Sequence, residues 1–506
     1  MEYDILLVNV TRTIYSSISC FSDCLGLYSI ASYLDKKNFI AKVLSTYVYN
    51  CKEAIINEIE NRGIKIIGFY TASDNLSVVK NLIKWIKKNY NVIIIVGGPE
   101  TVALKEDFLR ETKCDFISEG EGEETTYELL SFLIDGIGKV EDIKNLRYIN
   151  KEDIFCENDI RKPIMNLDSI GFPNIKNSLN LNFRKSDTVG IITGRGCPYH
   201  CSFCYEGANA KCVRFRSLKN VFEEIDYIIE NNKSLKYINI YDDTFTLNYD
   251  RVKEFCKEIK KRNIKWFCEA HATNICKYDD MIDIMIDAGL IGMQIGLESG
   301  SDRVLKAYNK NTNAEMICKV VEKCKKSNLT HMSGNFIVGG ALESKETIKE
   351  SMDLAAKLIE IGRGMFECTT VFLAPYPKTR ISSCPEEFDL TIHKDLLKKN
   401  VNTMKTAVIS TKKLSIEEIT NAKIEFDKFI NEQYKKQALL SEKKDIYNCF
   451  FGTGSYMNLN PKWSQAYYEQ QYIETFIMNG FNTDESNIIE KYPIRSFELL
   501  YYDKDF

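Results

Sequence analysis

Short apolar runs alternate with helical, charge-rich stretches over the first 135 residues of the chain. The expected strands cover residues 4–10, 41–48, 64–72, 92–98 and 114–120, and segments rich in Lys, Glu, Leu and Ile separate them. Apolar strands that are joined by helices indicate a parallel sheet with both faces covered. Residues 1–135 are therefore predicted to form a doubly wound α/β domain.

The loops at the strand ends are the expected binding surface of this domain, because ligands of a doubly wound sheet bind beyond the carboxyl ends of its strands. The third and fourth strands end in TASDN and GGPET, which carry Thr71, Ser73, Gly97 and Gly98, and the fifth ends in EGEGE. Two adjacent glycines allow a bulky ligand to approach the backbone closely. A glycine pair can also merely end a strand, and that alternative stays open.

A second series of strands and helices follows a break in the pattern. Turn residues replace periodic apolar positions over residues 136–185, which we expect to be a linker. Six apolar runs then cover residues 188–194, 237–243, 266–272, 292–299, 331–340 and 366–375. They predict a partial (β/α)6 barrel of the TIM type over 186–385, with its chemistry at the carboxyl ends of the strands. Residues 386–506 are mainly helical in pattern and then aromatic, and we expect a cap or a substrate domain there.

The charge balance disfavours nucleic acid as a partner. The chain has 67 Lys and Arg against 71 Asp and Glu, and it has no basic block that would follow a phosphate backbone. Its start lacks the features of a secretory signal, and no stretch reaches the roughly 18 apolar residues of a membrane span. We expect a cytoplasmic protein without stable membrane insertion, whose 17 cysteines are mostly reduced thiols.

Three cysteines are grouped like metal ligands. Cys197, Cys201 and Cys204 lie in GRGCPYHCSFCYE, directly after the first expected barrel strand. Electron-transfer 4Fe–4S clusters use four cysteines, and structural zinc sites use four ligands. Three thiolates on a 4Fe–4S cluster would therefore leave one iron open. His200 could instead complete a zinc site, and that alternative stays open.

The spacing Cys-x-x-x-Cys-x-aromatic-Cys, with Phe203 before Cys204, resembles the radical S-adenosylmethionine (radical SAM) superfamily. The resemblance implies that the amino and carboxylate groups of S-adenosylmethionine bind the open iron, and that the reduced cluster then releases a deoxyadenosyl radical. Such a radical attacks almost any nearby C–H bond, so the site is expected to exclude water and to work anaerobically.

Two acidic motifs extend the resemblance downstream. YDDTF resembles the second-strand motif of this superfamily, which implies that Asp242 and Asp243 meet the amino group of S-adenosylmethionine. GLESGSDRVL resembles the fourth-strand motif, which implies that Glu298 contacts the ribose hydroxyls, with Ser299 beside it. Alone, the aspartates would indicate a strand-end turn and Glu298 the N-cap of a helix.

The other motifs are less specific. RFRS carries Arg214 and resembles the basic segment after the cluster loop, which implies a contact with S-adenosylmethionine. FIVGG and APYPKT occupy the places of the fifth- and sixth-strand motifs. His271 stands where many relatives have an arginine, so its role stays open between an active-site contact and a hydrogen-bonded core histidine.

The first domain resembles the Rossmann-like cobalamin-binding domain of the cobalamin-dependent radical SAM class, because GGPET and EGEGEET end its fourth and fifth strands. The resemblance implies that Thr71 and Ser73 bond to the nucleotide tail and that Gly97 and Gly98 lie against the cofactor. Residues 1–199 contain no histidine, so the Asp-x-His-x-x-Gly motif of other cobalamin domains is absent. Cobalt then lacks a protein histidine ligand, or the domain has lost the cofactor and serves packing or substrate docking.

The class that the chain resembles implies methyl transfer to an unactivated carbon of a small-molecule or peptide substrate, with electrons from a reductant such as flavodoxin or ferredoxin. Cyclisation or rearrangement by a radical SAM enzyme stays open. So does a non-catalytic cobalamin or iron–sulfur sensor, which would need no S-adenosylmethionine pocket. A few aromatic residues near the carboxyl end are candidates for stacking on a substrate or for packing a small domain; they are Tyr456, Trp463, Tyr467, Tyr468 and Tyr472.

Overall fold

The computed structural model describes residues 3–11, 24–47, 50–72, 75–179, 188–209, 212–397, 403–438 and 440. The described chain divides into two compact units. The first holds residues up to 245 together with 374–387 and 392–408, and the second holds 246–373, 388–391 and the residues from 409 onward. Ser73 and the aromatic residues near the carboxyl end, Tyr456 to Tyr472, lie outside the described residues.

The first unit contains a seven-stranded sheet in the order β2-β1-β3-β4-β5-β6-β7. Its parallel strands are β1 (Ile5–Thr11), β2 (Ala41–Tyr47), β3 (Ile66–Tyr70), β4 (Ile93–Gly97) and β5 (Phe116–Ser118). The antiparallel strands β6 (Leu146–Ile149) and β7 (Phe155–Glu157) extend the sheet beyond β5. The predicted doubly wound fold is confirmed, and its five strands lie where the apolar runs placed them. The order 2-1-3-4-5 reverses direction between β1 and β3, where ligands of such sheets bind.

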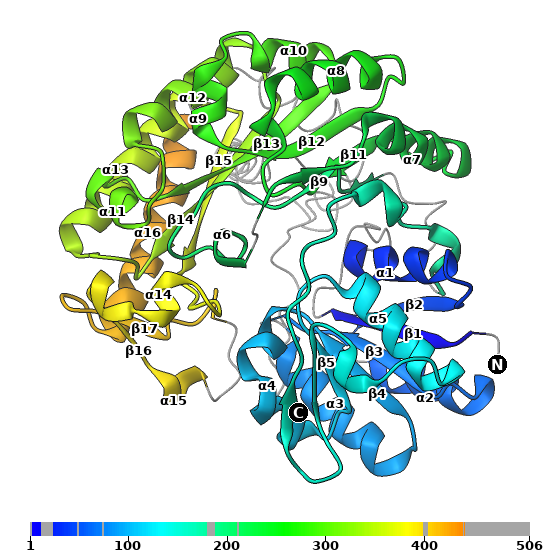
Figure 1. Ribbon diagram of the computed structural model, residues 1–506. Coiled ribbons are helices and arrows are strands. Elements are labelled where there is room, and N and C mark those ends of the chain that lie inside the picture. The colour runs from blue at the N-terminus through cyan, green and yellow to red at the C-terminus, as the bar shows by residue number, and fades with distance from the viewer. Residues whose placement is uncertain are drawn as a thin grey trace, which may run out of the picture. The chain divides into compact units, whose positions relative to one another are not determined.

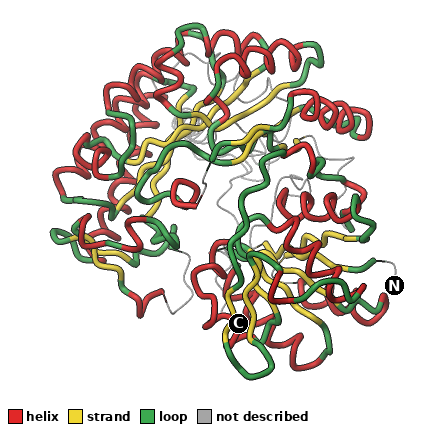
Figure 2. The backbone as a smooth tube through the Cα atoms, viewed as in Figure 1, coloured by secondary structure: helices red, strands yellow, loops and turns green. Residues whose placement is uncertain are grey.

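Helices cover both faces of this sheet (Figures 1 and 2). Figure 1 shows α1 (Leu25–Asp35) and α5 (Gly122–Leu130) on one face, and α2 (Cys51–Arg62) and α3 (Leu76–Asn89) on the other. Helix α4 (Pro99–Thr112) joins β4 to β5. Helix α2 ends at Gly63, whose φ of +67° is the left-handed conformation that glycine adopts without strain.

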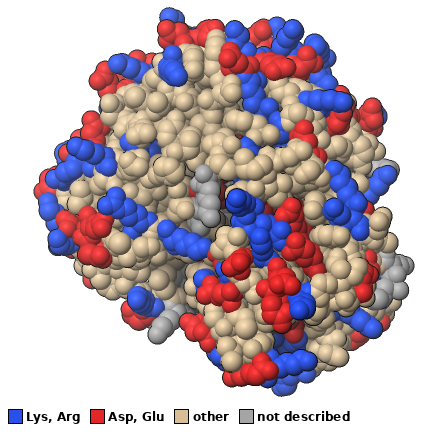
Figure 3. All heavy atoms as spheres, viewed as in Figure 1, with Lys and Arg blue, Asp and Glu red and all other residues tan. Residues whose placement is uncertain are grey.

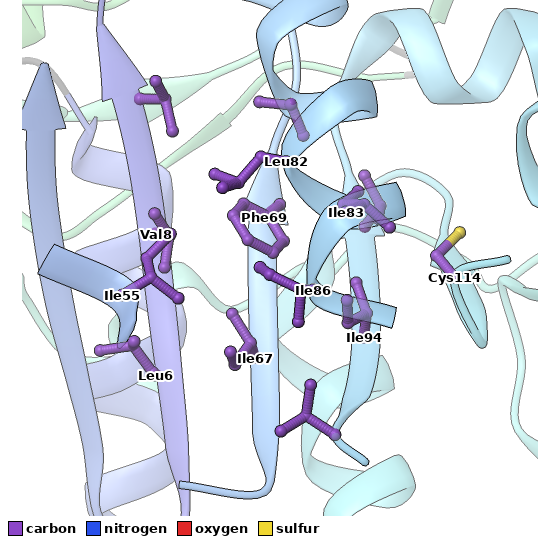
Figure 4. Packing of buried hydrophobic residues seen from close by; sticks show 14 of the residues in the cluster. Leu6, Val8, Ile55, Ile67, Phe69, Leu82, Ile83, Ile86, Ile94 and Cys114 are labelled. Carbon is purple, nitrogen blue, oxygen red and sulfur yellow. The ribbon is translucent and has the colours of Figure 1, made fainter. Parts of the chain in front are cut away.

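Helix α3 illustrates why these segments fold as they do. Val79, Leu82, Ile83 and Ile86 recur at helical spacing and are buried against the sheet. Figure 4 shows Leu82, Ile83 and Ile86 packed over apolar side chains of three strands; these are Leu6, Val8, Ile67, Phe69 and Ile94. Burial of each such side chain contributes about 1.5–3 kcal/mol. This core fixes the strand ends that carry the binding loops.

The first unit also holds the start of the predicted barrel. Strands β8 (Thr188–Ile191) and β11 (Tyr237–Ile240) pair in parallel, and α7 (Leu218–Asn231) lies between them in sequence. The short strands β9 (Gly194–Arg195) and β10 (Arg214–Phe215) form an antiparallel ribbon. Between the ribbon strands run the three cysteines and α6 (Tyr205–Asn209). The small helices α14 (Arg380–Ser383) and α15 (Lys394–Leu397) belong to the same unit.

The second unit holds the remaining four predicted barrel strands, β12 (Lys265–Ala270), β13 (Leu290–Glu298), β14 (His331–Val338) and β15 (Phe366–Phe372), all parallel. Its helices are α8 (Tyr249–Lys260), α9 (Ala272–Lys277), α10 (Met281–Asp287), α11 (Asp302–Ala307), α12 (Ala314–Lys326), α13 (Lys345–Ile361) and α16 (Ile416–Ala438). The short strands β16 (Leu390–Ile392) and β17 (Ile409–Thr411) follow β15 in the chain.

The long helix α16 packs on the outer strands of the second unit. The Tyr434 hydroxyl accepts a hydrogen bond from the Cys368 amide at 2.8 Å, and the Phe426 ring packs against the Phe336 ring at a tilt, with ring centroids 5.3 Å apart. The described part of the last predicted segment contains this helix together with β16 and β17, and its role as a cap or substrate domain stays a prediction. None of the helices in the described ranges combines the length and the apolar character that crossing a bilayer requires.

Candidate active site

The cluster loop, residues 196–204, connects β9 to α6. Cys201 is buried, and Cys197 and Cys204 are half-buried. The Cys204 amide donates to the Cys201 carbonyl at 3.1 Å, which tightens the end of the loop. Burial raises the pKa of the Cys204 thiol, the Cys197 thiol raises it further, and the backbone amides of Gly207 and Glu206 oppose the shift. One compact loop thus carries all three thiols.

The donor set fits an iron–sulfur cluster in ligand type and in number. The three thiols come from one short loop, and Cys197 lies near enough to Cys204 to shift its pKa. Within the described residues, no group of three or more His, Cys, Asp or Glu side chains is placed so that it could hold a metal ion, so the fit lies in the kind and number of the donors and not in their positions. His200, the fourth ligand of the zinc alternative, has its Nδ1 atom 3.2 Å from the Gly207 carbonyl oxygen.

Asp242 braces the turn that leads into the cluster loop. Its carboxylate accepts hydrogen bonds from the Thr193 amide and the Thr193 hydroxyl, both at 2.5 Å, and from the Gly194 amide at 3.0 Å. The side chain is buried. Charge-assisted bonds of this kind are stronger than neutral ones. Both oxygens of Asp242 are therefore engaged by the protein backbone and a hydroxyl, while its predicted contact with S-adenosylmethionine stays a prediction.

The next two residues of the motif hold the loop itself. Asp243 accepts a hydrogen bond from the Gly196 amide at 2.8 Å, and burial raises the pKa of its carboxyl group. The Thr244 hydroxyl lies 3.7 Å from the Cys197 sulfur. The YDDT sequence after β11 thus contacts residues 193 to 197 at successive points.

Arg214 points to an acidic residue of the first domain. Its Nη1 atom donates to both carboxylate oxygens of Glu121, at 2.7 and 3.0 Å, and to the Ile164 carbonyl at 2.9 Å. Burial, followed by the charge of Asp243, raises the pKa of the nearby Glu206 to about 7. The contact of Arg214 with S-adenosylmethionine remains a prediction, and Glu121 is a site residue that the motif comparison did not select.

In the second unit, Glu298 ends β13 with an unusual backbone. Its φ is +61°, a left-handed conformation that costs a non-glycine residue energy and that persists where the surroundings enforce it. The register between β13 and β14 shifts between Gly296 and Glu298. The buried carboxylate pairs with the Lys310 ammonium at 2.7 Å. A Cβ atom on Gly296 would lie 2.2 Å from the Glu298 Oε1 atom and 2.4 Å from the Lys310 Nζ atom, so the ends of these two flexible side chains would have to shift.

Ser299 faces the interior of the second unit. The side chain is fully buried, and its hydroxyl lies 3.2 Å from the hydroxyl of Ser351 on α13 and accepts a hydrogen bond from the Ser301 amide at 3.1 Å. A Cβ atom on Gly300 would come within 2.3 Å of the Glu350 carbonyl oxygen. The sequence Ser-Gly-Ser therefore packs the turn after β13 tightly against α13.

His271 lies at the carboxyl end of β12, where it caps α9. Its Nδ1 atom accepts a hydrogen bond from the Thr273 amide at 3.4 Å. Burial, followed by the charge of Lys310, lowers the pKa of His271 to about 3, so the imidazole is neutral at physiological pH.

Lys310, which contacts Glu298 and affects His271, is a site residue that the sequence motifs did not select. It borders an open groove of about 340 Å³ whose lining is mostly polar; the lining residues are Asp302, Lys306, Asn309, Lys310, Asn311, Thr312, Asn313 and Met316.

The loops of the first domain that were expected to hold cobalamin also bind one another. The Thr71 amide and hydroxyl both donate to the Gly97 carbonyl, at 2.8 and 3.0 Å. Gly98 has a φ of +112°, and a Cβ atom there would lie 2.1 Å from the Thr71 carbonyl oxygen. The close approach that requires Gly98 is therefore to the backbone of β3. Contacts of Thr71, Ser73, Gly97 and Gly98 with cobalamin stay predictions.

Asn75 organises the point where the strand order reverses, and the motifs did not select it. Its side-chain amide donates to the Val10 carbonyl at 3.0 Å and to the Tyr70 carbonyl at 3.2 Å, and its Oδ1 atom accepts from the Ala72 amide. One side chain thus ties the ends of β1 and β3 together. An asparagine just before a helix was the available sequence signal.

The family models match both parts of the chain. Residues 191–355 match the radical SAM superfamily, and residues 21–130 match the B12 binding domain. The chain belongs to the cobalamin-dependent radical SAM family. Its cofactors are those of the two domains: a 4Fe–4S cluster and S-adenosylmethionine for the first match, and cobalamin for the second.

Named relatives of this radical SAM protein differ in what they are described as doing. An uncharacterised methyltransferase of Pyrococcus horikoshii is 30% identical over 321 residues, which cover 62% of this chain and 66% of that protein. An anaerobic magnesium-protoporphyrin IX monomethyl ester cyclase of Rubrivivax gelatinosus is 24% identical over 56% of this chain and 52% of that one. The chain therefore spans between half and two thirds of the length of these two relatives.

A solved structure shares the fold over nearly the whole chain. The cobalamin-dependent S-adenosylmethionine radical enzyme OxsB, with aqua-cobalamin and S-adenosylmethionine bound, aligns with a TM-score of 0.71 and 18% identity, covering 96% of this chain and 82% of that one. At this identity the likeness concerns the fold. It confirms the predicted combination of a doubly wound domain with a radical SAM barrel.

Proposed function

We propose that this radical SAM protein is a methyltransferase that acts on an unactivated carbon of a small-molecule or peptide substrate. The observation that carries the proposal is the presence, in one chain, of a B12 binding domain and of a radical SAM domain. The relative from Pyrococcus horikoshii, which is named a methyltransferase, supports it. When bound, the reduced cluster and S-adenosylmethionine supply a deoxyadenosyl radical, and cobalamin supplies a transferable methyl group.

The residues of the chain contribute position and charge. Cys197, Cys201 and Cys204 would hold the cluster, and Asp242 fixes the turn that presents their loop. We assign the ribose of S-adenosylmethionine to Glu298, whose strained backbone and single lysine partner leave it able to exchange that partner for a ligand. His271 stays neutral and places no second positive charge beside Lys310.

A second candidate function is cyclisation or rearrangement without methyl transfer. The cyclase from Rubrivivax gelatinosus supports this alternative, because it aligns over a comparable part of the chain. The two functions differ in their products. Methyl transfer releases one S-adenosylhomocysteine for each methyl group delivered, whereas cyclisation by the deoxyadenosyl radical releases none.

The test is an anaerobic reconstitution with iron, sulfide and hydroxocobalamin, followed by addition of dithionite and S-adenosylmethionine. Deoxyadenosine, S-adenosylhomocysteine and bound cobalamin are quantified for the wild type and for Cys201→Ala. Methyl transfer predicts bound cobalamin and both products from the wild type, with deoxyadenosine lost in the variant. Deoxyadenosine without S-adenosylhomocysteine would favour the cyclase alternative, and neither product with bound metal would favour the sensor.

The remaining parts of the proposal concern the surroundings of the enzyme. We propose a flavodoxin or ferredoxin as the electron donor, a cytoplasmic location and no nucleic acid partner. Figure 3 shows lysine and arginine interspersed with aspartate and glutamate over the face in view. The 67 Lys and Arg of the chain are balanced by 71 Asp and Glu, whereas a surface that tracks a phosphate backbone is strongly basic.

A further inference from the structure

Alternate glutamates of one loop in the first domain reach basic residues on either side of the cluster loop. The segment 118–124, SEGEGEE, links β5 to α5 and carries Glu119, Glu121 and Glu123. We call it the acidic loop. Its glycines permit the tight path: Gly120 has a φ of +76°, and a Cβ atom on Gly122 would lie 2.8 Å from the Ile30 side chain.

Glu121 joins the two strands that flank the cluster loop. Arg195 precedes Cys197 by two positions, and Arg214 is its cross-strand partner in the β9–β10 ribbon. The Glu121 Oε1 atom accepts from Arg195 at 3.0 Å and from Arg214 at 2.7 Å. The other oxygen accepts from the Ile164 amide at 2.8 Å. A single carboxylate therefore ties together both ends of the segment that carries the cysteines.

Glu123 reinforces the same contact from a more buried position. Its Oε1 atom accepts from Arg195 at 2.6 Å and from the Ser29 hydroxyl of α1 at 2.7 Å. Burial alone would raise the pKa of Glu123, but the charge and hydrogen bond of Arg195 lower it overall. The carboxylate is therefore ionised, and it faces a guanidinium that carries two acidic partners.

Glu119 adds a third connection through the segment 374–387. Glu119 forms ion pairs with Lys378 and with Arg147. The same segment contacts the cysteine region directly: the Ile381 amide donates to the Ser202 carbonyl at 3.1 Å, and the Tyr376 ring meets the Tyr205 ring edge-on, with centroids 6.4 Å apart. The sixth-strand motif APYPKT thus bridges the acidic loop and the cluster loop.

We propose that the acidic loop is a clamp that sets the position of the cluster loop against the B12 binding domain. Glu121 and Glu123 are positioning residues, because they act on the cysteines through Arg195 and Arg214. The inference rests on the proposed function in one respect: methyl transfer needs the cluster side and the cobalamin side at a fixed separation. Misplacement by about 1 Å can lower a rate roughly a hundredfold.

The first test uses the full chain without cofactors and measures amide hydrogen exchange by mass spectrometry. Glu121→Gln is expected to speed exchange of residues 196–204 by roughly tenfold, because local opening becomes easier when its ties are lost. The matched control is Glu124→Gln. Glu124 lies in the first turn of α5, the helix that Glu121 caps, and pairs with Arg161 at 2.9 Å. In the Glu124→Gln variant, amide exchange of residues 196–204 is expected to be as slow as in the wild type.

A double variant keeps the test decisive if the single variant folds poorly. Glu121→Gln combined with Arg214→Gln removes both charges and leaves neither unpaired, and the clamp predicts the same fast exchange of the cluster loop. Wild-type exchange in both variants, or equal loosening by Glu124→Gln, would overturn the proposal. So would faster exchange spread evenly over the whole first unit, because that is the result of a general loss of stability.

A second readout uses the reconstituted enzyme. Glu121→Gln is expected to lower release of S-adenosylhomocysteine roughly tenfold or more and to lower deoxyadenosine formation by a smaller factor. That release would follow from breakage of the sulfur–methyl bond of S-adenosylmethionine, for which bound cobalamin, kept reduced by dithionite, would supply the methyl acceptor. Parallel loss of both products would contradict the clamp. If the wild type releases no S-adenosylhomocysteine, the methyltransferase proposal fails, and the exchange experiment still decides the clamp.

Discussion

The two acidic motifs of the radical SAM barrel, one in each unit, are held in opposite ways. Asp242 in the first unit directs both carboxylate oxygens at the backbone and hydroxyl of the turn at residues 193–194. Glu298 in the second unit has a left-handed backbone and a single lysine partner beside an open groove. A carboxylate bound by backbone amides is a fixed brace, whereas one paired with a flexible lysine can re-pair with a ligand. Two acidic motifs that look alike in the sequence therefore differ in function: the first holds a turn in place, and the second has a carboxylate that can bind a ligand.

The largest effect is expected from removing the brace. Asp242→Ala leaves two buried amides and a hydroxyl without their acceptor, and each unsatisfied buried group costs about 1–3 kcal/mol. We expect the free energy of unfolding to fall by about 3–5 kcal/mol, together with loss of reconstituted iron. Thermal or denaturant unfolding of the cofactor-free chain, with iron analysis after reconstitution, measures both.

Asp242→Asn is the matched control for this prediction. The amide keeps one oxygen as an acceptor for the Thr193 and Gly194 amides, so most of the stability and iron content should survive. Full stability of Asp242→Ala would show that the turn at residues 193–194 does not depend on this carboxylate. The conclusion that Asp242 is a fixed brace while Glu298 can change its partner would then be wrong.

A smaller effect is expected where the second motif is crowded. In Gly296→Ala the new Cβ atom would meet the Glu298 carboxylate at 2.2 Å and the Lys310 ammonium at 2.4 Å. The ion pair must shift, and overpacking of this kind costs about 1–3 kcal/mol. Because both atoms end flexible side chains, we expect the variant to lose only about 1 kcal/mol of stability and to bind S-adenosylmethionine more weakly, as measured by unfolding and by calorimetry.

Gly26→Ala provides the control for this glycine. A Cβ atom at Gly26, on helix α1, has nothing within 4 Å. Alanine is the better helix former there and should stabilise the chain by about 0.5–1 kcal/mol. Equal stability changes for the two substitutions would mean that the Glu298–Lys310 pair moves aside for the added methyl group at no cost.

The fold was largely accessible from the sequence because apolar runs mark buried parallel strands. All eleven expected strands, such as 4–10 and 331–340, overlap strands of the structure, as Ile5–Thr11 and His331–Val338 illustrate. Strands β6 and β7 were not predicted because they are short and because the sequence there shows turn residues and little periodicity; β7 forms the edge of the sheet.

The site was accessible only in part, because motifs name residues and leave their partners unnamed. The cysteine spacing selects Cys197, Cys201 and Cys204, yet nothing local in the sequence pairs Glu298 with Lys310 or Glu121 with Arg214. Lys310 is brought next to Glu298 by the path of the chain through α11, and Arg214 is brought next to Glu121 by the packing of segments 93 residues apart. Gly98 shows another limit: the sequence predicts a close approach of a ligand there, whereas the close approach in the structure is that of the Thr71 carbonyl oxygen, and the ligand contact stays a prediction.

The smallest effect, and the finest probe of the second motif, is the pH dependence contributed by His271. The pKa of His271 is about 3 in the folded chain and 6.5 in its ordinary state. Between these two pH values the unfolded chain binds a proton at this residue and the folded chain does not. The stabilising contribution is complete above pH 6.5 and is lost as the pH falls toward 3. Between pH 6.5 and 5.5 this contribution to the free energy of unfolding should decrease by about 1 kcal/mol.

His271→Asn should remove this part of the dependence of the free energy of unfolding on pH. Lys310→Gln should keep most of it, because burial is the larger cause of the lowered pKa. An unchanged slope in His271→Asn would mean that the imidazole takes up a proton equally well in the folded and the unfolded chain. The inference that His271 is uncharged beside Lys310 would then be wrong.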